Sequence, residues 1–403
     1  MLWLTGGNVY DVERGVFRRA DVGIEVDRIA AIMPDARPAS GDRIVDVGGA
    51  WLLPGLIDCH VHITVPTEPA DPGASARRSD AAVALYAAKA AERTLLGGIT
   101  TARDVGGWNY VEMAVRDAID AGHCVGPRLF LAGRLLSITT GTADLYPGMY
   151  EIANGAEEVR KAARKQLARG ADLIKVMATG AMYSSEHEDA RAIQYRREEL
   201  QAAVEIARDN HKHVAAHAHA CRGIENAVEA GCDSVEHGTF ADEAVLKRMA
   251  EKGTFLVPTN CVFPAMLDDA GLTAAMPAHM RQRVLENHEI HTKAIRAAHR
   301  LGVRIAMGTD AGTPGNHHGQ NARECVLMAT EVGMSPQESI YCATMNPARL
   351  LRREKDLGSI EVGKFADLVG CRADPLADIT ELTRVAFVMK GGAIYKDELT
   401  RTN

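Results

Sequence analysis

The feature that most constrains the fold is an eightfold alternation of short apolar runs with longer stretches of helical composition. The stretches between the runs are rich in Ala, Glu, Arg and Leu, and a Gly commonly ends them, as at Gly231 and Gly253. The apolar runs lie at Trp51–Ile57, Ile99–Arg103, Arg128–Ala132, Asp172–Val176, Val214–His217, Ser234–Glu236, Phe255–Val257 and Arg304–Met307. Strands that alternate with helices form parallel sheets, and eight such units are the number that closes a barrel.

The two chain ends have a different pattern. They contain short alternating runs with turn signals, such as Ile24–Ile29 and Val385–Met389. Each end alone is too short to bury a face, so we expect the two ends to pair. The predicted fold class is therefore α/β, with a (β/α)8 TIM barrel over residues 51–355 and a small β-sandwich domain built from residues 1–50 and 356–403.

Composition excludes several classes of protein. The 403 residues are 46% hydrophobic and 25% charged, which is ordinary for a globular chain and unlike a disordered one. A net charge of −7 gives no electrostatic reason to bind nucleic acid or an anionic membrane. The eight cysteines are scattered without a CxxC motif, as in reduced cytosolic proteins. We therefore expect a cytoplasmic protein that acts on a small molecule.

Polar residues follow several of the apolar runs at their C-terminal ends. In a barrel these ends converge on one mouth, which is where active sites form. Residues far apart in the sequence would therefore meet in space. The candidates are His60, His62, Lys175, His217, His219, His237 and Asp310.

The histidines and the aspartate have the chemistry of metal ligands. His60 and His62 point the same way in an extended segment, so they could bind one metal ion or be two ordinary loop histidines. Neutral imidazoles at His217 and His237 are common ligands of divalent transition metals. Asp310 could bind metal and accept a proton from metal-bound water. Together with Lys175, this set follows strands one, one, four, five, six and eight in order, which predicts a metal site.

Lys175 ends a strand that is predicted to be buried. An unpaired buried ammonium group is costly, so its pKa should be depressed. A neutral amine can react with carbon dioxide to give a carbamate, an anion that can bridge two metal ions. A lysine paired with an acid is the alternative for this residue.

Several segments together resemble the amidohydrolase superfamily of metal-dependent hydrolases over nearly the whole chain. They are PGLIDCHVH (54–62), GGITTARDVGG (97–107), DLIKVMATG (172–180), HAHA (217–220), SVEHGTF (234–240), GTDAG (308–312), ATMNPARLL (343–351) and GSIEVGKFADLV (358–369). The subgroup with this lysine and this HAH…EHG pattern includes Xaa-Pro dipeptidases, Xaa-Arg/Lys carboxypeptidase-like enzymes and ochratoxin amidases. Imidazolonepropionases are more distant.

The resemblance implies a binuclear amidohydrolase that cleaves a peptide-like, N-acyl amino acid or carbamate bond by attack of a metal-bound hydroxide. The implied metal ligands are His60, His62 and Asp310 for the more buried of two divalent ions, His217 and His237 for the more exposed ion, and carboxylated Lys175 as the bridge. The expected metal is Zn²⁺, with Asp310 also as the catalytic proton carrier. Tyr183 and His219 are our candidates for substrate binding, and relatives of this kind are usually homo-oligomers.

Two alternatives remain open at this stage. A mononuclear zinc deaminase or cyclic-amide hydrolase of the same superfamily would lack the bridging Lys175. A non-catalytic scaffold relative would have lost ligands, and none is missing here. Many subgroup relatives have a Gly- and His-rich segment where this chain has SITTGTADLYPGMYE (137–151). That segment should lie at the mouth, so the substrates of those relatives do not transfer directly.

Overall fold

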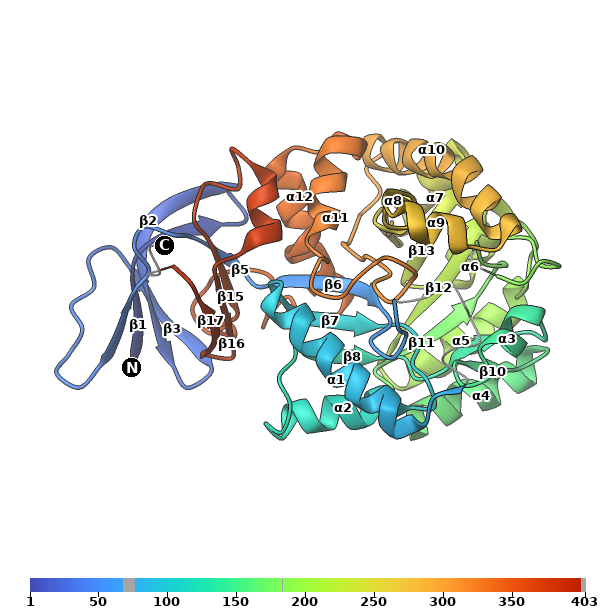
Figure 1. Ribbon diagram of the computed structural model, residues 1–403, viewed down its shortest axis with the longest axis horizontal. Coiled ribbons are helices and arrows are strands. Elements are labelled where there is room, and N and C mark those ends of the chain that lie inside the picture. Colours follow the sequence, from blue (N-terminus) through green and yellow to red (C-terminus); the bar gives the residue numbers. More distant parts are fainter. Residues whose placement is uncertain (68–76, 183, 400–403) are drawn as a thin grey trace.

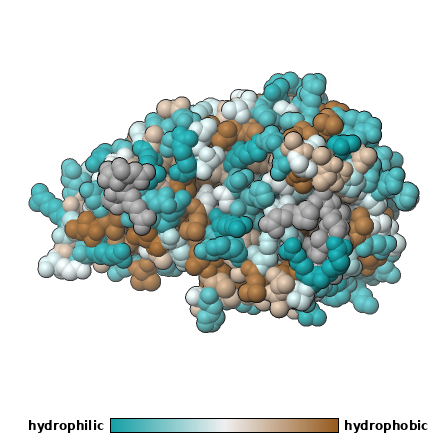
Figure 2. All heavy atoms as spheres, viewed as in Figure 1, coloured by the Kyte–Doolittle hydropathy of each residue, from teal (hydrophilic) through white to brown (hydrophobic). Residues whose placement is uncertain are grey.

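The computed structural model describes residues 1–67, 77–182 and 184–399. Figure 1 shows two parts: a sheet that contains both chain ends, and a larger body of parallel strands surrounded by helices. None of the helices in the described ranges is long and apolar enough to span a bilayer. The face shown in Figure 2 is mainly hydrophilic, with hydrophobic side chains in separate patches.

The chain ends pair, as predicted, in one eight-stranded sheet. Its strand order is β17-β16-β15-β5-β1-β2-β3, with β4 parallel to β1. The strands are β1 Leu2–Asp11, β2 Val16–Glu25, β3 Arg28–Met33, β4 Arg43–Asp46, β5 Trp51–Pro54, β15 Leu368–Cys371, β16 Phe387–Lys390 and β17 Ala393–Asp397. We call this the end sheet. A second facing sheet, which a sandwich requires, is not found among the described residues, so the predicted sandwich is not confirmed.

The first predicted barrel strand is divided between the two parts of the molecule. β5 joins the end sheet through antiparallel pairing with β15, and β6 (Leu56–Val61) joins the parallel strands. Gly55 separates them, and a Cβ atom there would lie only 2.1 Å from the hydroxyl oxygen of Thr100. Only glycine therefore allows the chain to pass this close to β7.

The remaining strands form two parallel sheets, which confirms the α/β class. The smaller sheet has the order β6-β7-β8, and the larger has the order β10-β9-β11-β12-β13-β14. The strands are β7 Ile99–Asp104, β8 Arg128–Leu131, β9 Leu135–Ser137, β10 Tyr150–Ile152, β11 Leu173–Met177, β12 His213–Ala220, β13 Ser234–Phe240 and β14 Phe255–Val257.

Closure of the barrel is not confirmed, because the two parallel sheets are not joined into one ladder. The run predicted as the eighth strand, Arg304–Met307, forms only an isolated bridge, between Ile305 and Leu256 of β14. A second bridge joins Ala311 to Val61 of β6. The backbone NH of Asp310 also donates to the carbonyl of His60 at 2.7 Å. This segment thus lies between β14 and β6 without being a regular strand.

Helices cover the parallel strands and follow the predicted stretches closely. Local capping explains several ends: the Asp242 side chain accepts from the NH of Val245 at the start of α7, and Gly253 ends α7 with a φ of 72°. The helices are α1 Asp80–Leu96, α2 Val111–Asp120, α3 Gly141–Leu145, α4 Ala156–Ala168, α5 Arg197–Asp209, α6 Cys221–Ala230, α7 Glu243–Lys252, α8 Val262–Asp268, α9 Ala270–Ala275, α10 Ala278–Arg300, α11 Arg323–Leu327, α12 Pro336–Ala343 and α13 Met345–Leu350. A π-helical turn, Met328–Val332, continues α11, and a 3-10 helix lies at Ile379–Arg384.

Candidate functional site

One pocket brings together the polar residues that follow the parallel strands. It opens at the C-terminal ends of β6, β11, β12 and β13, beside the loop that carries Asp310. Its lining includes His60, His62, Lys175, His217, His219, His237 and Asp310. Tyr183, the remaining sequence candidate, lies outside the described residues.

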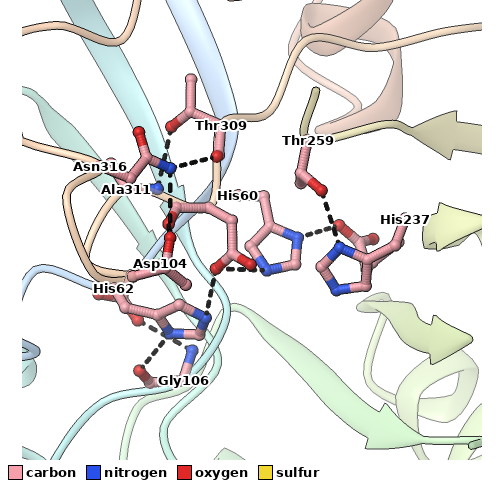
Figure 3. Close-up of polar contacts among 12 residues, drawn as sticks. His60, His62, Asp104, Gly106, His237, Thr259, Thr309, Ala311 and Asn316 are labelled. Atoms are coloured by element: carbon pink, nitrogen blue, oxygen red, sulfur yellow. Dashed lines mark hydrogen bonds and ion pairs between the residues drawn. The ribbon is translucent and has the colours of Figure 1, made fainter. Parts of the chain in front are cut away.

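His60 and His62 face the same carboxylate. His60 lies near the end of β6 and His62 directly follows the strand, so the extended backbone turns both side chains to one side. The Nε2 atoms of His60 and His62 lie 3.5 and 3.3 Å from Oδ1 of Asp310. Figure 3 shows the two imidazoles side by side, with His237 beyond His60.

The histidines of β12 and β13 form a second group. The ring centroid of His217 lies 4.7 Å from that of His219 and 4.6 Å from that of His237. Among the described residues, two sets have ligand atoms close enough to hold a metal ion: His217, His219 and His237, and His60, His237 and Asp310. His237 is common to both sets. His219, which the sequence suggested as a substrate-binding residue, thus also lies within reach of a metal ion held by His217 and His237.

Each of the four histidines proposed as ligands has one ring nitrogen already engaged. His62 donates from Nδ1 to the Gly106 carbonyl at 2.8 Å, and His217 donates from Nε2 to the Gly180 carbonyl at 3.1 Å. Nδ1 of His237 is 2.8 Å from the hydroxyl of Thr259, as Figure 3 shows. Nδ1 of His60 lies 2.7 Å from Oε2 of Glu236.

These contacts fix the ring orientations. The other nitrogens of His60 and His62 face the carboxylate of Asp310, which is itself a candidate ligand. Metal-bound histidines in proteins are held in this way. The residues present therefore fit a transition-metal site.

Burial and the mutual charges set the protonation of the site. Burial lowers the pKa of His60 to about 4 and that of His217 to about 3, so both imidazoles are neutral at pH 7. Burial alone would raise the pKa of Asp310, but His60 and His62 beside it hold the value at about 2. The same carboxylate raises the pKa of His62 against the effect of burial.

Lys175 is buried without a hydrogen-bond partner. The residue is 1% exposed on β11, and its Nζ makes no hydrogen bond with any described residue. Burial lowers the pKa of this amine to about 8. A buried amine with no hydrogen-bond partner needs an explanation. The direct pairing with an acid that was the sequence alternative is not observed within residues 1–67, 77–182 and 184–399.

Two candidate residues have strained backbone. His237 has a φ of 71° and Asp310 a φ of 60°, in the left-handed region that side chains other than glycine rarely adopt. Thr259, which contacts His237, also has a positive φ of 57°. Such strain is retained where the surrounding structure requires it, and it concentrates at functional sites.

Three buried charged residues behind the candidate ligands carry no signal in the sequence: Asp58, Arg103 and Glu236. Glu236 and Arg103 are fully buried beneath His60. Asp58 accepts from the hydroxyl of Thr309 at 2.6 Å and from the NH of His60 at 3.0 Å, so it ties β6 to the segment of Asp310. Glu236 and Asp58 lie inside segments that resemble the family. A charged residue on a strand, however, does not show in the sequence which distant residue it will contact.

The upper walls of the pocket are largely apolar. Segment 137–151 supplies Tyr146, Met149 and Tyr150, which confirms its predicted place at the mouth. Met177 packs in the same apolar cluster as these three side chains. A second apolar cluster in the lining contains Met182, Val262, Phe263, Met266 and Val284. Among the described lining residues, Lys175 is the sole lysine, and arginine is absent.

The chain is similar in sequence and in structure to known proteins. The model of the amidohydrolase family matches residues 51–395. The ochratoxinase of Aspergillus niger is 34% identical over 383 residues, covering 86% of this chain and 75% of the ochratoxinase.

Solved structures agree with the sequence matches. A Xaa-Pro dipeptidase with methionine bound in its active site superposes with a TM-score of 0.90 at 34% identity, covering 98% of this chain and 99% of the dipeptidase. A prolidase in complex with N-methylphosphonate-L-proline gives a TM-score of 0.91 at 30% identity, with the same coverage.

Proposed function

Since the chain belongs to the amidohydrolase family and is a hydrolase of carbon–nitrogen bonds, we propose that it cleaves an amide-type bond at a centre of two divalent metal ions. The observation that carries the proposal is the arrangement of the four histidines, each held through one ring nitrogen by a residue outside the proposed ligand set, around the carboxylate of Asp310. We propose His60, His62 and Asp310 as ligands of one ion, and His217 and His237 as ligands of the other. The ions would be Zn²⁺.

Lys175 is proposed as the bridge between the ions, in its carboxylated form. Its buried Nζ has no hydrogen-bond partner among the described residues, and carboxylation would convert it into an anion that two cations can neutralise. The two divalent ions, when bound, would activate water and polarise the scissile carbonyl. A closed (β/α)8 barrel, as in the predicted fold, would hold these ligands at one mouth.

The protein's own residues move the proton and hold the substrate. The carboxylate of Asp310 is ionised at neutral pH and lies within 3.5 Å of two imidazoles, so it is placed to take a proton from the attacking water and return it to the leaving nitrogen. The apolar walls suit a substrate with an apolar acyl or amine group. A carboxylate on a peptide-like substrate would be received by His219, or by Tyr183 as predicted from the sequence.

Metal analysis of the purified protein tests the centre. We expect about two zinc ions per subunit in the wild type and fewer in His217→Ala. The matched control is His213→Ala, because His213 is also buried on β12 but lies outside the pocket lining. One ion per subunit in the wild type would favour a mononuclear enzyme instead. A metal-free protein that stays inert with added zinc would favour a non-catalytic relative.

A hydrolysis screen tests the substrate class. N-acyl amino acids, Xaa-Pro dipeptides and aryl carbamates would be compared at equal concentration, with product amines measured. We expect turnover of at least one class with an apolar acyl or amine group. Failure of every class, with both ions bound, would contradict amide hydrolysis as the activity.

A further inference from the structure

An ion pair lies buried directly behind His60. Arg103 of β7 and Glu236 of β13 are both fully buried, and Nη2 of Arg103 donates to Oε1 of Glu236 at 2.8 Å. Nε of Arg103 also donates to the carbonyl of Cys59 at 2.6 Å. Burying two charges costs solvation that their attraction does not always return. A fully buried pair next to a proposed ligand therefore suggests a role other than stability.

The two oxygens of Glu236 have different partners. Oε1 accepts from Arg103 and from the hydroxyl of Ser234, the latter at 2.5 Å. Oε2 lies 2.7 Å from Nδ1 of His60. Arginine can only donate, so Oε1 is held as an acceptor and the carboxylate cannot turn. The ion pair with Arg103 holds Glu236 as a carboxylate, so Oε2 has no hydrogen and accepts as well. This places the ring hydrogen of His60 on Nδ1 and the lone pair on Nε2.

His60 differs in this respect from the other proposed ligands. His62 and His217 donate to backbone carbonyls, which no substitution can convert into donors. His237 contacts a hydroxyl, which can either donate or accept. Among the four, His60 is the one whose nitrogen turned away from the proposed metal position meets a carboxylate, so an isosteric change of Glu236 can invert its tautomer.

We propose that Arg103 and Glu236 are positioning residues that fix the tautomer of His60, so that Nε2 offers its lone pair to the metal ion. The inference rests on the proposed metal centre, since it assigns His60 as a ligand. Neither residue lines the pocket. Arg103 orients Glu236, and Glu236 orients the ring of His60.

The decisive variant is Glu236→Gln. Because Arg103 still requires an acceptor, the amide oxygen would face Arg103 and the amide NH₂ would face Nδ1 of His60. That NH₂ can only donate, so the ring hydrogen would move to Nε2 and point at the metal position. We expect zinc affinity at this position to fall by about 10- to 100-fold. Chelator competition on the purified variant measures it, independently of activity.

A double variant separates the tautomer from a general loss of structure. In Glu236→Gln with Arg103→Met, no arginine orients the amide, so its oxygen can turn to Nδ1 of His60 while its NH₂ faces Ser234. We expect zinc affinity to return to within a few-fold of the wild type. If the double variant binds zinc as weakly as Glu236→Gln or more weakly, the positioning role is overturned. If the single variant, whose arginine has lost its charged partner, fails to fold, the double variant is compared with the wild type instead, and a zinc affinity 10-fold or more below that of the wild type overturns the role.

Glu381→Gln is the matched control. Glu381 is also a buried glutamate paired with an arginine, Arg384, but it lies in the 3-10 helix beside β15. We expect it to bind two ions with wild-type affinity. A drop equal to that of Glu236→Gln would mean that losing any such pair weakens the site, and would overturn the proposal.

The wild type provides a test that needs no substitution. In metal-free protein labelled with ¹⁵N-histidine, we expect the ring hydrogen of His60 on Nδ1. A hydrogen on Nε2 would overturn the inference. A wild type that binds no zinc at all would refute the proposed function instead, so the two failures are distinguishable.

Discussion

Replacing Lys175 by Met should stabilise the metal-free protein even as it destroys the proposed site. The Lys175 side chain is buried and its Nζ has no hydrogen-bond partner among the described residues. Its burial lowers the pKa from 10.5 to about 8. At 1.36 kcal/mol per pH unit, this difference corresponds to a penalty of about 3 kcal/mol for carrying the charge in the folded protein. Methionine has a similar shape and removes the charge.

The pH dependence gives the sign of this effect. Between pH 8 and pH 10.5 the unfolded chain binds more protons at this lysine than the folded protein, so the lysine's contribution to stability rises with pH in that window. The full penalty is present below pH 8 and disappears above pH 10.5. The advantage of Lys175→Met should therefore be about 3 kcal/mol at pH 7 and fall towards zero near pH 10.5.

Urea unfolding of metal-stripped protein in carbonate-free buffer measures the difference in unfolding free energy between Lys175→Met and the wild type, at pH 7 and near pH 10.5. Chelator and degassed buffer are needed because zinc or carboxylation would stabilise the wild type selectively. Lys247→Met is a suitable control, since Lys247 is an exposed lysine on α7. If Lys175→Met is less stable than the wild type at pH 7, or if its advantage does not depend on pH, the reasoning about an unpaired buried ammonium is wrong.

Three further changes test the chemistry and the mouth of the pocket. Asp310→Asn should keep the fold and lower kcat by about 10²- to 10⁴-fold, because an amide cannot carry the proton; wild-type turnover would refute this role. Lys175→Ala should lose metal and activity, and bicarbonate with a short-chain acid should restore part of both; full activity with two ions bound would exclude a bridge. Glu188 accepts from the NH of Thr142 at 3.1 Å and from Gln194 at 2.7 Å. Glu188→Ala should therefore loosen segment 137–151 and raise KM several-fold with kcat nearly unchanged, whereas a drop in kcat alone would contradict a binding role.

The sequence was sufficient to predict the parts of the fold that depend on local pattern. The strand–helix rhythm predicted the parallel sheets, and the alternating runs at both ends predicted that those ends pair. The convergence of distant candidates on one pocket followed from the rule that parallel strands share a C-terminal edge. That rule needs only strand order, so it brought His60 and Asp310 together across 250 residues.

Other features depended on contacts that a single sequence does not reveal. The break at Gly55 follows from the close approach of Thr100, which is distant in the chain. Arg304–Met307 has the composition of a strand, yet its ladder contacts are isolated bridges. The role of Glu236 depends on Arg103 and His60 lying on either side of it. Tertiary contacts of this kind override or complete local propensity.

The single-residue junction at Gly55 has a consequence for the history of the molecule. β5 is hydrogen-bonded to β15, and β6 follows after one residue with His60 and His62 near its end. The NH of Gly55 itself donates to the carbonyl of Asp367, just before β15. The C-terminal part of the chain thereby holds the base of the strand that carries the first two candidate ligands. We therefore expect that the end sheet of a relative could not replace this one without disturbing β6. A chimera of two relatives would need the end sheet and the candidate ligands from the same parent.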